Sequence, residues 1–351
     1  MPEKTASRPL SLTAGVVILT LILLAIFFFV PGWNVNPEGL GGKKIVVHRG
    51  DGLRRIVGSI QENGGARYQT PLLVTAYLFP GLRNIKPGRY TIPPGHSNYS
   101  LLAYLHDRPQ DEERITIPEG LRKERIAAIV SSRLDMDSLS FMQSATDSTL
   151  LSSLDLQESG IEGYLFPGTY NFAWASTPEE VIAFLVGRYR AFLTDSLRAL
   201  AGQRGLDEHE MLTLASIVEA ETPLDSEKPR IAGVYLNRLK KNMRLQADPT
   251  VQYALGDKPR RLLYTDLDID SPYNTYRRRG LPPGPICSPG ALAILAVLKP
   301  EETSYLYFVA DGKGGHRFAR TIAEHAANVR QYRRVRLEAE ETTARPAPPS
   351  Q

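Results

Sequence analysis

The feature that most constrains this chain is an apolar run near its N-terminus, 21 residues from Leu10 to Val30 without a charged side chain. As an α-helix such a run spans about 30 Å, which matches the hydrocarbon core of a bilayer. A cleaved signal peptide is the alternative, but the run exceeds a normal signal core and the following Pro31-Gly32-Trp33-Asn34 lacks small residues at the cleavage spacing. A buried core helix is disfavoured because every face is apolar. We therefore predict a retained transmembrane anchor over residues 10–30.

The positive charges around this segment do not decide its orientation. Lys4 and Arg8 precede it, whereas Lys43, Lys44 and Arg49 follow it. No Lys or Arg lies between residues 31 and 42, and a long following domain translocates largely regardless of its charge. We expect a cytoplasmic N-terminus at residues 1–9 and a body outside the cytoplasm.

Charge and cysteine usage exclude several classes of protein. The chain has 42 Lys and Arg against 38 Asp and Glu in 351 residues, so its net charge is only +4 and nucleic acid is not a favoured partner. The lone Cys287 excludes an intrachain disulfide and a cysteine-rich zinc site. His316 and His325, with Glu324 nearby, fit no metal-ligand spacing. The sequence therefore predicts neither a metal nor a cofactor.

The patterning of the body predicts an α+β fold in two parts. A Gly/Pro-rich linker (31–43) precedes a compact α+β unit (44–110), which begins with a strand at residues 44–48. A larger α+β domain follows (111–336), in which a capping box at Thr177 starts a helix that we expect to continue to about Leu200. We expect residues 248–289 to be rich in turns and the Pro-containing tail (337–351) to be disordered.

Two carboxylates near the end of an apolar helix are candidates for acid catalysis. Glu219 and Glu221 close the predicted helix 208–221, where desolvation and the negative helix end disfavour an anion and raise a carboxyl pKa, as a general acid requires. They lie about 200° apart on the helix, so periodicity does not choose between them. Solvated helix-terminal carboxylates are the simpler interpretation of the pattern alone.

A second candidate site combines polar and aromatic side chains on loops stiffened by Pro and Gly. Gln246, Asp248, Asn274 and Tyr276 lie in two such loops. Aromatic rings that stack on sugars, beside polar groups that bind their substituents, are typical of a glycan groove. Ordinary turns explain the same residues almost as well, and Asp248 before Pro249 also suits a helix cap.

Several motifs in one order give the chain a specific resemblance to a known family. They are Ile117-Pro118-Glu119-Gly120, Glu162 to Tyr170, Leu214 to Glu221, Val234 to Leu239, Leu245 to Thr250, Ser271 to Tyr276, Gly280 to Gly290 and Tyr307-Phe308-Val309. Through these segments the chain resembles the endolytic murein transglycosylases of the MltG, or YceG-like, family. The resemblance covers almost the whole chain.

The resemblance implies a LysM-like fold for residues 44–110 and a reaction on peptidoglycan. The family cleaves the β-1,4 bond between N-acetylmuramic acid and N-acetylglucosamine inside glycan strands without water, which leaves 1,6-anhydro ends and terminates or releases nascent strands. By this resemblance Glu219 is the catalytic residue, and Glu162, Gln246, Asp248, Asn274 and Tyr276 are substrate-binding candidates. It also implies a bacterial inner-membrane location, no cofactor, and cell-wall synthases as partners.

Two departures and two alternatives accompany this resemblance. Gly168 stands where many relatives carry an acidic residue, and Ser288 stands where Asn is usual. The first alternative is a muramidase that uses Asp248 as second carboxylate and water as nucleophile. The second is a non-catalytic glycan-binding scaffold for cell-wall synthases.

Overall fold

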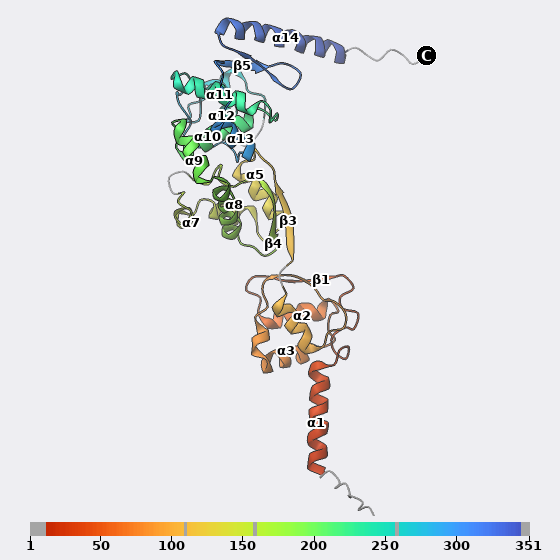
Figure 1. Cartoon of the computed structure of the whole chain (residues 1–351). Helices are drawn as coiled ribbons and strands as arrows, with labels where there is room; N and C mark the ends of the chain where they lie inside the picture. The colour runs from red at the N-terminus through yellow and green to blue at the C-terminus, as the bar shows by residue number, and fades with distance from the viewer. Residues whose placement is uncertain (1–11, 109–110, 157–159, 257–259, 345–351) are drawn as a thin grey trace, which may run out of the picture. The chain divides into compact units, whose positions relative to one another are not determined.

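The computed structural model describes residues 12–108, 111–156, 160–256 and 260–344, with the side chains of 338–344 left out (Figure 1). The chain divides into two compact units. The small unit comprises residues 1–114 with 133–135 and 171–176, and the large unit comprises 115–132, 136–170 and 177–351. Helices with small two-stranded sheets make up both, which confirms the predicted α+β class.

The N-terminal apolar run forms the helix α1 (Leu12–Phe29). Its mean hydropathy is 2.8, and it is long and apolar enough to cross a membrane. Nearly all of its side chains are exposed, and only Phe28 is buried. Because the core helix of a soluble protein buries its apolar side chains, this exposure is consistent with the predicted anchor.

The small unit packs three helices against one antiparallel strand pair. The strand β1 (Lys44–Val47) pairs with β2 (Gly88–Thr91), which places Lys44 opposite Thr91. The helical elements of the small unit after residue 44 are α2 (Leu53–Glu62), α3 (Gln69–Leu78), the 3₁₀-helix η1 (Pro80–Arg83) and α4 (Asn98–Asp107). The expected linker 31–43 is part of this fold, since its Val35 and Leu40 are buried in the same core.

The large unit is built around a helical core. The helices α10 (Glu208–Glu221), α11 (Lys228–Lys240) and α13 (Ala291–Leu298) pack on one another, and α10 is buried on all faces from Met211 to Val218. The other elements that lie wholly in this unit are α5 (Lys123–Ser131), α6 (Ser138–Ser144), α7 (Ser148–Ser153), α8 (Pro178–Phe192), α9 (Asp195–Gln203), α12 (Asp248–Leu255), η2 (Tyr264–Asp268), β5 (Tyr307–Ala310), β6 (His316–Ala319) and α14 (Ile322–Ala344). The strands β3 (Glu112–Ile117) and β4 (Gly168–Ala173) each have residues in both units. The two-stranded sheets are β3–β4 and β5–β6, and α14 packs on the second (Figure 1).

Three expectations for the large unit need correction. The single helix expected from Thr177 to Leu200 is two, because the buried Leu193 leaves helical geometry at ψ 79° and α9 begins at Asp195, after its N-cap residue Thr194. The stretch 248–289, expected to be rich in turns, also holds α12 and η2. The expected disordered tail includes the end of α14, whose Leu, Glu and Ala residues favour a helix, and 345–351 lie outside the described residues.

Candidate functional site

The last turn of α10 places its two glutamates in different surroundings. The helix begins with a capping box in which Asp207 and Glu210 each accept a hydrogen bond from the other's backbone N–H. It ends at Glu221, because Thr222 is extended and buried. Glu219 and Glu221 project from opposite edges of this last turn, so the two carboxyl groups have different neighbours.

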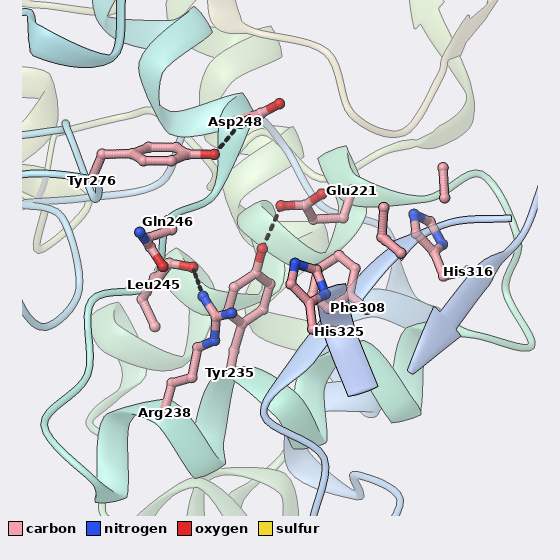
Figure 2. A pocket seen from close by; sticks show the side chains of 12 residues that line it. Glu221, Tyr235, Arg238, Leu245, Gln246, Asp248, Tyr276, Phe308, His316 and His325 are labelled. Carbon is pink, nitrogen blue, oxygen red and sulfur yellow. Dashed lines mark hydrogen bonds between the residues drawn. The ribbon is translucent and has the colours of Figure 1, made fainter. Parts of the chain in front are cut away.

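A cavity of about 370 Å³ lies beside Glu221 in the large unit (Figure 2). Figure 2 shows Glu221 with Tyr276 and Gln246 on one side and Phe308, His325 and His316 on the other. Twelve residues line this cavity: Glu221, Tyr235, Arg238, Leu245, Gln246, Asp248, Tyr276, Phe308, Val309, Ala310, His316 and His325. Three of the six site residues expected from sequence, Gln246, Asp248 and Tyr276, are among them.

The Glu221 carboxyl is held as an acid that titrates near neutrality. Burial, with a smaller contribution from the negative Asp248, raises its pKa to about 7. The hydroxyl of Tyr235, which donates a hydrogen bond to Glu221, and the positive Arg238 act in the opposite direction. The effect of burial outweighs that of these two groups, so the net shift of the Glu221 pKa is upward.

Two loops that are hydrogen-bonded to each other form the wall that carries Gln246 and Asp248. The backbone N–H of Gln246 donates to the carbonyl of Thr275 at 3.2 Å, and that of Ala247 donates to Thr275 Oγ1 at 3.0 Å. Gln246 has a φ of 50°, in the left-handed region where non-glycine residues are uncommon. Tyr276 donates its hydroxyl to Asp248 Oδ1 across the wall. These contacts fix an exposed glutamine and carboxylate at the mouth of the cavity.

Arg238 is a structural cation of the cavity. Its Nη1 donates to the carbonyl of Leu245 at 2.7 Å, and its Nε donates to that of Leu306 at 2.6 Å. Its guanidinium also lies 5.3 Å from the ring centroid of Tyr307. Arg238 thereby joins the Gln246 loop to β5 and leaves a positive charge beside Glu221.

Two histidines whose spacing fits no metal-ligand pattern line this cavity. His316, in β6, lies 2.7 Å through Nδ1 from Glu227 Oε2, and its backbone N–H donates to Oε1 of the same carboxylate at 2.9 Å. His325, in α14, stacks on Tyr307, and burial together with Arg238 lowers its pKa. Its Nδ1 is buried without a hydrogen-bond partner among the described residues. Their spacing gave no signal, because a strand and a helix bring them together.

Glu219 is part of a separate buried cluster and does not line the cavity. Its side chain is 7% exposed, and its Oε1 lies 2.8 Å from Nζ of Lys228, whose side chain is 2% exposed. Its Oε2 accepts the backbone N–H of Gly290 at 3.0 Å. Lys228 also pairs with Asp225 at 2.8 Å. Both contacts of Glu219 are charge-assisted hydrogen bonds to a carboxylate, the arrangement of a buried ion pair.

The two other expected site residues also lie outside the cavity lining. Glu162 is buried beside Lys123, whose backbone N–H donates to Oε1 at 3.1 Å and whose Nζ lies 3.4 Å from Oε2. Burial raises the pKa of Glu162 to about 7 despite this cation. Asn274 is fully buried and donates to the carbonyls of Leu267 and Ile269, while its Oδ1 accepts the N–H of Tyr276. Asn274 therefore supports the loop that presents Tyr276.

The site shows no arrangement of metal ligands. Within the described ranges no group of three or more His, Cys, Asp and Glu side chains could hold a metal ion. Cys287 is buried against the carbonyl of Ser216, and burial raises the pKa of its thiol. The reactive groups in the cavity lining include a carboxyl group, a second carboxylate, phenols and imidazoles.

Curated relatives of this chain share one name. This chain is 36% identical over 227 residues to a protein of Bacillus subtilis (strain 168) named endolytic murein transglycosylase. The match covers 60% of this chain and 63% of that protein. The chain is 29% identical over 335 residues to a protein of the same name from Streptococcus pneumoniae serotype 2 (strain D39), covering 85% of this chain and 60% of the relative. The chain thus spans about 60% of the length of these relatives.

A solved structure and a family model cover most of the chain. The crystal structure of a YceG-like protein from Listeria monocytogenes superposes with a TM-score of 0.57 at 29% identity, covering 81% of this chain and 98% of that one. The model of the YceG-like family matches residues 45–331, which include every residue that lines the cavity. The chain belongs to the YceG-like family.

Proposed function

We propose that this protein is an endolytic murein transglycosylase, a lyase that cleaves the β-1,4 bond between N-acetylmuramic acid and N-acetylglucosamine within glycan strands. The names of its relatives support this activity. The cavity supports it independently, because an acid, a second carboxylate and aromatic side chains are the groups that glycan cleavage uses. The products would carry 1,6-anhydromuramic ends.

We propose Glu221 as the catalytic acid, in place of the Glu219 that the resemblance suggested. The observation that carries this proposal is the place of Glu221 in the cavity, next to Gln246, Asp248 and Tyr276. A pKa of about 7 leaves a protonated carboxyl available near neutral pH, where a general acid works best. Glu219, bound by Lys228 and Gly290, has the contacts of a structural carboxylate.

The reaction needs one carboxyl group in two successive roles. Protonated Glu221 donates its proton to the glycosidic oxygen as the bond from C1 of the muramic residue breaks. The C6 hydroxyl of the same residue then attacks C1, and its proton returns to Glu221, so that no water is consumed. An intramolecular hydroxyl replaces the water or the second carboxylate of ordinary glycosidases. Acid–base catalysis of this kind supplies roughly 10²- to 10⁴-fold, and positioning supplies more.

A muramidase is the second candidate function. Asp248 supports it as a second carboxylate in the lining of the same cavity. In that mechanism Asp248 would activate water or attack C1 directly, and the products would carry reducing ends. The hydrogen bond from Tyr276 to Asp248 favours the transglycosylase, because it occupies one oxygen of the carboxylate.

The apolar helix α1 extends the proposal to location and partners. We propose that α1 anchors the protein in a bacterial inner membrane with its N-terminus in the cytoplasm, so that the large unit meets peptidoglycan outside. The antiparallel β1–β2 pair with α2, α3 and α4 supports a LysM-like assignment for residues 44–110. From that position the enzyme would terminate or release nascent strands beside cell-wall synthases. A failure to crosslink with any synthase would contradict this partnership.

A matched pair of variants tests activity and residue together. Full-length protein in detergent micelles is incubated with uncrosslinked glycan strands, and products are read by mass spectrometry beside Glu221→Gln and Glu219→Gln. We expect anhydro-ended internal fragments from the wild type, a loss of at least 10²-fold in Glu221→Gln, and retained turnover in folded Glu219→Gln. Loss in Glu219→Gln alone would return the role of acid to Glu219. Reducing ends would establish the muramidase, and binding without cleavage would favour the scaffold.

A further inference from the structure

The end of α1 is built into the small unit. The carbonyl of Phe27, in the last turn of α1, accepts hydrogen bonds from Asn98 Nδ2 at 2.7 Å and from Trp33 Nε1 at 3.2 Å. Last-turn carbonyls have no partner within their own helix, so these donors act as a C-terminal cap. A second contact from Asn34 Nδ2 to Asn98 Oδ1 at 2.7 Å fixes the asparagine itself. The end of α1 is therefore hydrogen-bonded directly to the rest of the small unit.

An aromatic cluster joins the same end of α1 to the helix α3. The ring of Phe79, directly after α3, lies 5.8 Å from Phe28 and 6.4 Å from Phe29 between centroids. Tyr99 of α4 lies 4.9 Å from Phe79 and 5.2 Å from Phe29. Aromatic residues at this level are typical of the boundary between membrane and water.

The outer face of α3 presents an apolar stripe to solvent. Val74, Tyr77 and Leu78, which we call the α3 stripe, follow the i, i+3, i+4 spacing of one helix face and are 37%, 74% and 54% exposed. The opposite face of α3 is buried in the core of the small unit. Both faces of this short helix are thus mostly apolar, and an exposed apolar patch beside a membrane anchor marks a candidate membrane contact.

The charges around the α3 stripe fit an interfacial helix. No charged residue occurs between Arg67 and Arg83. Both arginines are exposed, and the Arg83 guanidinium lies 5.6 Å from the ring centroid of Tyr77. The same guanidinium donates to the carbonyls of Ala76 and Tyr77, which holds a positive charge at the end of the stripe, where anionic headgroups would lie if the face entered the acyl boundary.

From this geometry we propose that the small unit is seated in the membrane surface by the α3 stripe. The occupant of the stripe is the bilayer itself, because the stripe is continuous through Phe79 with the end of α1, whose own side chains are exposed and apolar. The inference rests on the proposed anchor role of α1. Its consequence is that the small unit is held at the headgroup layer and does not swing on a flexible tether.

Cysteine labelling in vesicles tests the seating. The only native cysteine, Cys287, is buried, so Leu78→Cys and the matched control Arg54→Cys, which is exposed on α2, can each be introduced into the full chain. In phosphatidylglycerol/phosphatidylethanolamine vesicles we expect a water-soluble maleimide to label position 78 at least tenfold more slowly than position 54, with the difference lost in detergent. The ratio between the two positions cancels any mixture of orientations.

Three outcomes would overturn the proposal, and they are distinguishable. Equal labelling of positions 78 and 54 contradicts the seating while leaving the anchor intact. Protein that does not float with the vesicles contradicts the anchor and the seating together. A fluorophore at position 78 should be quenched by spin-labelled lipid; protection without quenching would assign the stripe to a second copy of the chain. None of these readouts depends on glycan cleavage.

Discussion

The hydroxyl of Tyr235, which is buried in α11, donates a hydrogen bond to Oε1 of Glu221, the last residue of α10. The same ring packs edge-to-face on Phe308 of β5 at 5.7 Å. One tyrosine therefore connects the proposed acid to the strand that forms the opposite wall of the cavity. Because this hydrogen bond stabilises the anion, it sets how far burial can raise the pKa of Glu221.

Replacing Tyr235 with Phe should move the pH dependence of cleavage upward. The change removes the hydrogen bond that lowers the pKa of Glu221, and a hydrogen bond to a charged group is worth about 1.5–3 kcal/mol. We expect the alkaline limb of the profile of kcat/KM against pH, which reports loss of the protonated acid, to shift upward by about one to two units. The measurement is that profile between pH 5 and 9.

Asp248→Asn provides a control of opposite sign. The negative Asp248 raises the pKa of Glu221, so its removal should move the same limb downward. The shift should be smaller than one unit and should shrink in high salt, because Asp248 is exposed. Unchanged limbs in both variants would mean that Glu221 is not the titrating acid.

The sequence carries more local signal for the loops of the site than for the choice between Glu219 and Glu221. Gln246, Asp248 and Tyr276 could be chosen because Pro- and Gly-stiffened loops with polar and aromatic side chains carry their own local signal. Glu219 and Glu221 lie in the same helical turn. The apolar periodicity of the helix does not show which of them is the catalytic acid and which is a structural carboxylate. Only tertiary neighbours separate them: Lys228 and Gly290 for Glu219, and the cavity for Glu221.

The fold shows the same division between local and long-range information. The apolar run of α1 and the capping box of α8 are local signals, and both helices are present. The break at Leu193 was missed because the buried position of that side chain, set by distant neighbours, outweighs helix propensity. His316 and His325 were missed as cavity residues for a similar reason, since only the packing of β6 and α14 brings them together.

Lys228→Met should destabilise the large unit strongly. The substitution leaves the buried Glu219 carboxylate without its cation, and breaking a buried pair costs about 3–5 kcal/mol. In the double variant with Glu219→Gln, part of that loss should return, because no buried anion is left unpaired. Urea denaturation of the two single variants and the double variant measures this coupling. Strictly additive losses would show that the pair does not interact.

Glu162→Gln should change how stability depends on pH. A folded pKa of about 7, above the ordinary value of 4.5, means that the native state holds the proton more tightly and loses stability as pH rises through that interval. The Gln variant keeps an acceptor for the Lys123 N–H but cannot ionise. Relative to wild type, its free energy of unfolding should therefore rise by roughly 3 kcal/mol at most between pH 4.5 and 8. Parallel urea-denaturation curves for both proteins across that range would contradict this assignment.

Gly163, next to Glu162, is a backbone position at which we expect a single added methyl group to be costly. Its φ is 88°, and a Cβ there would meet Pro285 at 2.6 Å. Gly280 is a matched control, because its φ is 81° and nothing lies within 4 Å of the same methyl group. Gly280→Ala should cost about 1–2 kcal/mol from backbone strain alone, whereas Gly163→Ala adds the displacement of a proline ring that overpacking makes costly, about 1–3 kcal/mol more. Thermal unfolding of both variants measures the difference. Equal losses of stability would show that Pro285 moves away from the added methyl group at little cost.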